Sequence, residues 1–276
     1  MPDKYTATWV SHSSMGDFLR CPRLYYLRNV YKDPRSGRKV NMVAPPLALG
    51  LAVHDTLEAL LTVPAEQRFA RPLTERFEEN WQKVTGKLGG FTSEEDEAAA
   101  KARGRAMIER VERLPGPLRN KTIRLNQELP AYFISEADNI MLCGKIDWLE
   151  HVPTDDSVHV IDFKTGQREE KADSLQLPIY TLLLKNCQKR AVSRASYWYL
   201  EREDAPTPVA LPDADEAYER VMAVAKQVKQ AREEKAFLCP RGEDGCYACR
   251  PFEKILRGEA EHVGVGSYNQ DLYLIR

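Results

Sequence analysis

Three charged side chains stand among apolar neighbours in the middle of the chain. Asp162 and Lys164 lie in Val158-His-Val-Ile-Asp-Phe-Lys-Thr-Gly166, and Asp147 lies in Gly144-Lys-Ile-Asp-Trp-Leu149. If the first segment is a strand, Asp162 and Lys164 point to the same side. A buried carboxylate without a partner is costly, so these groups need each other or a metal ion. The pattern fits an Asp–Lys salt bridge and, equally, a Mg²⁺ or Mn²⁺ site in which the lysine stabilises charge on a phosphate.

A histidine and a glutamine–tyrosine pair lie on the faces of expected helices. His54 shares a face with Val53 and Leu57 and therefore points inward. A lone inward histidine is more often a core residue than a metal ligand. Gln176 and Tyr180 are four residues apart and share a face of the helix that follows the Asp162 strand. By themselves they indicate a partly exposed polar stripe.

The elements that must position these residues are a helical first section and a cluster of central strands. Hydrophobic periodicity and turn residues predict helices over 13–30, 47–63, 70–88, 94–114, 174–186 and 214–235, and strands over 123–135, 140–151, 158–164 and 195–200. After the helical front the order is βββαβα. Because the strands lie together in the sequence, we expect one α/β domain with a helical elaboration.

Composition limits the kinds of partner that the chain can have. The 276 residues include 40 Lys and Arg and 41 Asp and Glu, so binding to nucleic acid requires a local basic patch. The longest apolar runs are too short to span a bilayer, and the polar start, residues 1–8, lacks the apolar region of a secretory signal. We therefore expect a cytoplasmic protein without a membrane partner.

Such a basic patch occurs near the N-terminus. Between residues 20 and 39, Asp33 is the only acidic residue, and the basic residues are Arg20, Arg23, Arg28, Lys32, Arg35, Arg38 and Lys39. Lys and Arg bind phosphates, and tyrosines interleaved with them can stack on unpaired bases. The alternative is a solvated helix face, with Tyr25 and Tyr26 buried in the core.

Taken in order, these motifs resemble the RecB-like branch of the PD-(D/E)xK nuclease superfamily. The resemblance covers about residues 8–255 and is carried by Phe18–Tyr26, Gly50-x-x-x-His54, Gly144-Lys-Ile-Asp147, Asp162-Phe-Lys164-Thr-Gly166 and Gln176-x-x-x-Tyr180. It implies an α/β fold with a restriction-endonuclease-like core, which is a mixed central sheet flanked by helices. It also implies one nuclease domain over residues 1–276, with a helical insertion at about 65–118, a catalytic core at about 120–236 and a cysteine segment at 237–258.

The resemblance implies a role for each site residue. Asp147 and Asp162 would bind Mg²⁺ or Mn²⁺, together with His54 and the backbone carbonyl of Phe163, and Lys164 would be the catalytic lysine. Gln176 and Tyr180 would position the DNA strand, and the arginines Arg20, Arg23, Arg35 and Arg38 would contact its backbone. Glu128 lies where relatives often have an acidic residue, and we assign it no catalytic role.

Four of the six cysteines match the clasp of relatives that carry an iron–sulfur cluster. Those relatives use one N-terminal and three C-terminal cysteines, which correspond here to Cys21, Cys246 and Cys249, with Cys239 replacing the usual last cysteine, at whose place Ile255 stands. Four thiolates hold [4Fe–4S] or tetrahedral zinc equally well on chemical grounds. Cys143 and Cys187 lie in apolar runs and are expected to be core residues.

The expected activity is that of a metal-dependent DNA exonuclease acting on single-stranded ends in repair or recombination. Two alternatives are a CRISPR-associated nuclease that trims spacer precursors and a non-catalytic DNA-binding clasp with a nuclease fold. The chain lacks the GxxxxGK[ST] loop of helicases, so any unwinding requires a partner protein.

Overall fold

The chain forms two compact units, each assembled from segments that are distant in sequence. The computed structural model describes residues 3–125, 127 and 129–275, so the expectation for Glu128 lies outside the described residues. One unit comprises Met1–Val43, Ala131–Gly144 and Ala214–Arg276, and we call it the terminal unit. The other comprises Ala44–Pro130 and Lys145–Asp213, and we call it the central unit. The assignment of a single nuclease domain stays a prediction.

The central unit contains a four-stranded mixed sheet. Its order is β5 (Trp148–Val152), β6 (Ser157–Lys164), β7 (Val192–Tyr199) and β8 (Thr207–Val209). β6 runs antiparallel to β5 and parallel to β7, and β8 runs antiparallel to β7. The parallel pair requires a crossover, which is supplied by α6 (Gln176–Cys187). The expectation of a mixed sheet flanked by helices is confirmed.

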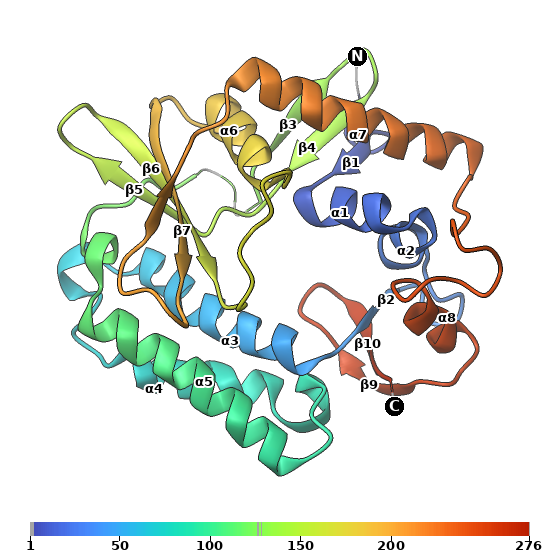
Figure 1. Cartoon of the computed structure of the whole chain (residues 1–276), viewed down its shortest axis with the longest axis horizontal. Helices are drawn as coiled ribbons and strands as arrows, with labels where there is room; N and C mark the ends of the chain where they lie inside the picture. The colour runs from blue at the N-terminus through green and yellow to red at the C-terminus, as the bar shows by residue number, and fades with distance from the viewer. Residues whose placement is uncertain (1–2, 126, 128, 276) are drawn as a thin grey trace. The chain divides into compact units, whose positions relative to one another are not determined.

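Three helices cover one face of this sheet. They are α3 (Pro45–Glu58), α4 (Leu73–Trp81) and α5 (Glu94–Arg113), and they pack side by side (Figure 1). Their apolar residues form a single core with Trp148, Ile161 and Phe163 of the strands. Because side chains alternate along a strand, Asp162 and Lys164 point to the opposite face, where α6 lies.

A row of polar side chains crosses three strands of the sheet, with His159 and Ser196 buried and Glu150 half-buried. Glu150 and His159 are direct partners in the β5–β6 register, and His159 Nδ1 lies 2.7 Å from Glu150 Oε2. His159 Nε2 lies 2.8 Å from the Ser196 hydroxyl on β7. A shift of any strand by one residue would move these groups to the other face, so the row stabilises the observed register.

The terminal unit holds the chain ends and two three-stranded sheets. One sheet has the order β1 (Thr8–Val10), β4 (Ile140–Cys143), β3 (Ala131–Ser135), and the other has the order β2 (Lys39–Met42), β10 (Gln270–Leu274), β9 (Glu261–Val265). The helices of this unit are α1 (His12–Arg20), α2 (Pro22–Tyr25), α7 (Ala214–Glu234) and α8 (Arg250–Leu256). α7 packs along α1 and β1 (Figure 1).

The expected helix over 13–30 is interrupted at Cys21. Ser11 caps α1 through a reciprocal pair of hydrogen bonds with Ser14, so the helix begins at His12, one residue before the expected start. Cys21 is extended because the ring of Pro22 disfavours helical geometry in the residue before it. The chain then continues as α2 and a π-helical turn, Tyr26–Val30.

The expected strand over 140–151 is two strands in two different sheets. β4 ends at Cys143 and β5 begins at Trp148, and the chain passes from the terminal unit to the central unit between Gly144 and Lys145. Of the strand expected over 123–135, the last five residues, Ala131–Ser135, form β3 after Pro130. Continuous apolar character predicted that strands exist here, and it carried no information about which sheet each one joins.

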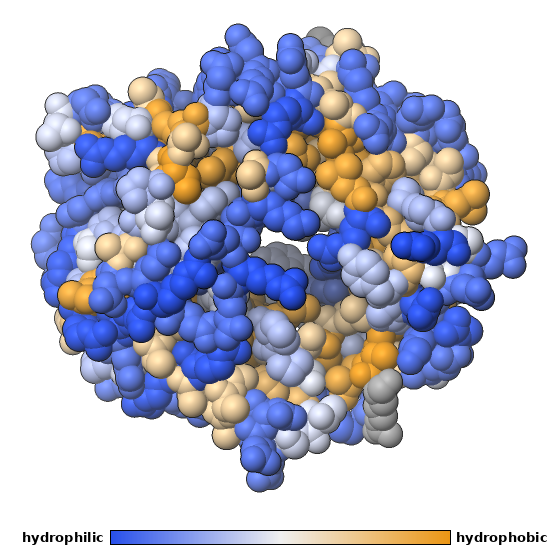
Figure 2. Space-filling model, viewed as in Figure 1, coloured by the Kyte–Doolittle hydropathy of each residue, from blue (hydrophilic) through white to orange (hydrophobic). Residues whose placement is uncertain are grey.

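Within the described residues, no helix is long and apolar enough to cross a membrane. Figure 2 shows hydrophilic residues over most of the visible face, with apolar residues in small separate areas.

Packing around Gly104 gives a test of the central core. A Cβ at Gly104 of α5 would lie 2.6 Å from Phe77 Cζ and 2.8 Å from Leu49 Cδ1. We expect Gly104→Ala to lower the free energy of unfolding by about 1–3 kcal/mol, because overpacking outweighs the helix propensity of alanine. Urea denaturation measures the change.

Gly16 of α1 provides the matched control, since a Cβ there meets no atom within 4 Å. Gly16→Ala is expected to stabilise the protein by up to about 1 kcal/mol. Equal gains from both substitutions would contradict the close packing of α5 on Phe77 and Leu49.

Candidate functional site

One helix and one loop of the central unit bring a histidine and two carboxylates together. α3 presents His54 and Glu58 on successive turns, and Asp147 immediately precedes β5. His54 Nδ1 lies 3.4 Å from Asp147 Oδ1 and 4.0 Å from Glu58 Oε1. These three residues each offer a ligand atom within 4.8 Å of the others. They therefore form a candidate metal centre.

Asp147 also connects this centre to the neighbouring strand. Its second oxygen, Oδ2, accepts a hydrogen bond of 2.9 Å from the Phe163 backbone N–H on β6. The two oxygens of Asp147 thus have different partners, and the loop before β5 is held against the end of β6. The expected role of the Phe163 carbonyl stays a prediction.

Asp162 and Lys164 form a second cluster with residues of α6. Lys164 Nζ lies 2.9 Å from Asp162 Oδ2 and donates to Gln176 Oε1 at 2.5 Å. The Gln176 amide and the Tyr180 hydroxyl both donate to Asp162 Oδ1, at 2.6 and 2.8 Å. The polar stripe of α6 is therefore buried against Asp162 and surrounds its carboxylate.

Electrostatic interactions join the two clusters. Burial, followed by the nearby Asp147 carboxylate, raises the pKa of Asp162 to about 6. Burial alone would lower the pKa of His54, but the neighbouring carboxylates, chiefly Asp147, raise it to about 9. Burial also raises the pKa of Glu58. Several carboxylates lie close together at a desolvated site, and such an arrangement favours a bound cation.

The donor set fits the metal ions expected from the sequence. Carboxylate oxygens and one imidazole nitrogen are suitable ligands for Mg²⁺ or Mn²⁺. His54, Asp147 and Glu58 would hold the ion through their side chains. The Asp162 carboxylate lies outside the set of mutually close ligand atoms, because Lys164, Gln176 and Tyr180 hold it.

Sequence reasoning missed three charged residues near the centre. Glu58 lies one helical turn after His54, and that spacing is a signal that could have identified it. Lys145 forms an ion pair with Glu58, and Glu170 accepts from Lys164 at 2.9 Å. Lys145 belongs to the Gly144–Asp147 motif, whereas Glu170 lies in a loop with no periodic pattern.

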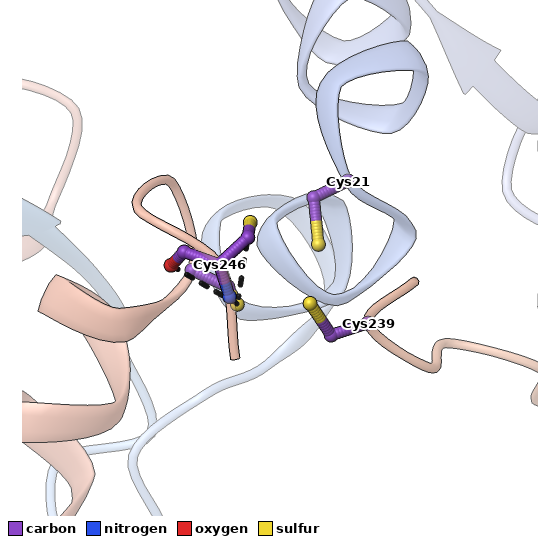
Figure 3. A group of neighbouring side chains, drawn as sticks. Cys21, Cys239 and Cys246 are labelled. Carbon is purple, nitrogen blue, oxygen red and sulfur yellow. Dashed lines mark hydrogen bonds between the residues drawn. The ribbon is translucent and has the colours of Figure 1, made fainter. Parts of the chain in front are cut away.

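The four cysteines of the predicted clasp meet in the terminal unit. Cys21 separates α1 from α2, Cys239 follows α7, Cys246 lies in the next loop and Cys249 precedes α8. Each offers a sulfur within 4.8 Å of the others, and Figure 3 shows the Cys21 and Cys239 sulfurs pointing toward each other. Sulfur ligands in this number suit a [4Fe–4S] cluster or zinc.

The thiols of this cluster differ in acidity. Burial raises the pKa of Cys249 to about 12 and also raises that of Cys21. Burial acts in the same direction on Cys246, but backbone N–H groups around it outweigh burial and lower its pKa to about 7. Gly245 has a φ of +70°, and a Cβ there would lie 3.0 Å from Cys249 Sγ, so a glycine is required beside the cluster.

Several arginines of the basic patch are paired with carboxylates. Arg23 forms a two-pronged pair with Glu253 of α8, at 2.6 and 3.2 Å. Arg35 contacts Asp33, and Arg38 contacts the buried Asp271. The side chain of Arg20 is exposed. Contact of these four arginines with DNA stays a prediction.

A family model described as the PD-(D/E)XK nuclease superfamily matches residues 9–254. The chain belongs to this superfamily. Membership indicates a metal-dependent nuclease that binds DNA, in agreement with the carboxylate-rich centre. No curated protein matches the chain in sequence.

The geometry predicts how the centre binds metal. Asp147→Asn and Glu58→Gln are each expected to weaken Mn²⁺ binding by tenfold or more, because each removes a charged ligand from a desolvated site. Electron paramagnetic resonance of free Mn²⁺ measures the affinity without DNA. Glu95→Gln, at an exposed position of α5, is the matched control. Unchanged affinity in Glu58→Gln would remove Glu58 from the ligand set.

Proposed function

We propose that this chain is a RecB-like DNA exonuclease that hydrolyses phosphodiester bonds at single-stranded ends. The observation that carries the proposal is the combination of His54, Asp147, Asp162 and Lys164 in one unit, with Lys164 ion-paired to Asp162 and His54 close to Asp147. The alternative is a non-catalytic DNA-binding clasp. Such a protein would have no need for these four groups in one unit.

The proposed ligands of the divalent metal are His54, Asp147, Asp162 and the Phe163 carbonyl, with Glu58 added by its position. When bound, Mg²⁺ or Mn²⁺ supplies Lewis-acid stabilisation of phosphate charge and makes water more acidic. In this proposal, the Asp162 carboxylate binds the cation while it also accepts from Lys164, Gln176 and Tyr180.

Lys164 has the properties of a charge-stabilising residue. Burial lowers the pKa of Lys164, but Asp162 and Glu170 outweigh burial and raise it. The ammonium group therefore keeps its proton at neutral pH and can donate to a phosphate oxygen as negative charge develops. A proton-accepting role would require a neutral amine, which these carboxylates disfavour.

Gln176 and Tyr180 are proposed to orient the site and the DNA strand. Burial and the Asp162 charge raise the pKa of Tyr180 well above its usual value, so the hydroxyl remains a donor. Both side chains hold Asp162 Oδ1, which supports a positioning role. We propose that Gln176 also reaches the strand through the same amide that contacts Asp162.

The finer assignments rest on the resemblance to the RecB-like branch. They are preference for single-stranded ends, action in repair or recombination in the cytoplasm, and cooperation with a helicase or another repair protein. CRISPR spacer trimming is the alternative biological role. Arg20, Arg23, Arg35 and Arg38 are proposed backbone contacts, and Arg20 is the candidate with no ion pair among the described residues.

The cysteine cluster is proposed to bind [4Fe–4S], with zinc as the alternative. Cys21 and the three C-terminal cysteines lie on different segments of the terminal unit, so a shared metal group would link them. Because the unfolded chain has no preformed site, the binding free energy contributes to folding stability.

The nuclease proposal predicts the effect of removing single charges. Asp162→Asn and Lys164→Ala should each lower cleavage of end-labelled single-stranded DNA by at least ~10²-fold in the presence of Mn²⁺, as loss of one charge-stabilising group does in other enzymes. Lys171→Ala, at an exposed position, should cleave like the unaltered protein.

Circular single-stranded DNA separates exonuclease from endonuclease action, because a circle has no end. We expect the circle to remain intact while the linear strand is degraded. Cleavage by purified Lys164→Ala at the unaltered rate would contradict the assigned centre, and rapid cutting of circles would contradict the exonuclease assignment.

The cluster proposal predicts metal content and stability. Anaerobically purified protein should be brown, with absorption near ~400 nm from iron–thiolate bonds. Cys246→Ser should lose iron and melt at a lower temperature, whereas Cys187→Ser should retain both. Stoichiometric zinc without iron would replace the cluster by a structural zinc site, and iron retained in Cys239→Ser would exclude Cys239 as a ligand.

A further inference from the structure

A basic cavity of about 400 Å³ lies within the terminal unit. The segment around β2 and the tip of the β9–β10 hairpin line it, so residues from both ends of the chain contribute. The cationic residues of the lining are Arg28, Lys32, Arg38 and Lys39. Its volume is in the range of cavities that bind small molecules.

The arginines of this cavity already have carboxylate partners. Arg28 Nη1 lies 3.0 Å from Asp17 Oδ1, and Arg38 lies 2.8 Å from Asp271 Oδ1. Both aspartates are buried, so these pairs belong to the framework of the unit. They hold the cavity wall in place without supplying free charge.

The two lysines have no such partner. Among the described residues, neither the Lys32 nor the Lys39 ammonium group has an ion pair or a hydrogen bond to a side chain. Partial burial, followed by the charges of Lys32 and Arg232, lowers the pKa of Lys39. Lys32 and Lys39 are both exposed residues, and their like charges repel each other. A bound anion would relieve this repulsion.

An aromatic side chain stands at the rim of the same cavity. Tyr268 is 76% exposed at the tip of the β9–β10 hairpin, where Asn269 adopts a φ of +54°. An exposed tyrosine ring is a stacking surface for an unpaired base. The side-chain amides of Asn29, Asn41 and Gln270 also line the cavity and can bond to base edges.

We propose that this cavity binds one nucleotide of a DNA single strand, with its phosphate on Lys32 and Lys39 and its base against Tyr268. The identity of the occupant rests on the proposed function. The site shares Arg38 with the expected backbone contacts and adds Lys32, Lys39 and Tyr268 to them. Arg23 and Arg35 do not line it, and their charges are paired with Glu253 and Asp33. It also shares no residue with the candidate metal centre.

The experiment measures binding of a fluorescent single strand by anisotropy in EDTA, so that no cleavage occurs. Lys32→Ala/Lys39→Ala should weaken binding at least tenfold and reduce the slope of log affinity against log salt by about 1.4, as loss of two phosphate contacts on a single strand predicts. The control variant Lys4→Ala/Lys254→Ala removes the same charge from the same unit. It should change the affinity and the salt slope by less than the Lys32→Ala/Lys39→Ala variant does.

A second arm tests the base. Tyr268→Ala should weaken binding about fivefold or more without changing the salt slope, and Tyr268→Phe should restore the affinity. An abasic strand should bind the unaltered protein and Tyr268→Ala equally. If the lysine double variant matches its control, or if Tyr268→Ala has no effect, the proposal is wrong.

Further arms separate the sources of the phosphate and the two proposals. The same variants are tested for binding of free dAMP. If dAMP binding depends on Lys32, Lys39 and Tyr268 but binding of the strand does not, the assignment of a DNA occupant is wrong. Lys164→Ala should lose cleavage and keep lysine-dependent strand binding. If the protein binds the strand through these lysines but never cleaves DNA, only the proposed nuclease activity is contradicted. If it cleaves DNA but its strand binding does not depend on the lysines, only the proposed nucleotide site is contradicted.

Discussion

An ionised carboxylate is stable inside a protein only where donors and cations surround it. Asp162 is 3% exposed, and Lys164, Gln176 and Tyr180 all donate to it. This requirement couples strand and helix: β6 must place Lys164 two residues after Asp162, and α6 must begin at Gln176 so that Tyr180 follows one turn later. The parallel pairing of β6 with β7 supplies the crossover that contains α6. The other face of β6 is then free to pack its apolar side chains on α3, α4 and α5.

The two units each gather metal-binding donors, and the donors differ in chemical character. In the central unit, oxygen and imidazole ligands suit a hard divalent cation, and burial together with the Asp147 charge raises the pKa of Asp162. In the terminal unit, four sulfurs suit iron or zinc. A hard cation exchanges with solvent and substrate, whereas thiolate ligands hold a closed structural group. This difference fits the proposed functions, which are catalysis at the oxygen and imidazole centre and stabilisation at the cysteine cluster.

Local sequence patterns predicted most of the central unit. The alternation in residues 158–164 placed Asp162 and Lys164 on one side, and the spacing of Gln176 and Tyr180 placed both on one helix face. The same reasoning wrongly predicted one strand over 140–151, because the apolar pattern is continuous although β4 and β5 are separate strands of different sheets. It also extended the first helix through Cys21, where the ring of Pro22 favours an extended residue.

Sequence patterns alone indicated the superfamily, the types of donor atom and the faces on which they lie, because strand and helix periods follow from local backbone geometry. Which distant groups meet became visible in the folded chain alone. Lys145 pairs with Glu58, Arg23 with Glu253 and Arg38 with Asp271, and no period connects the members of these pairs. Tyr268 likewise reaches the Lys32 and Lys39 cavity only because β10 pairs with β2. Such contacts depend on the free energy of packing and charge neutralisation summed over the whole unit. This sum cannot be obtained from short segments of sequence.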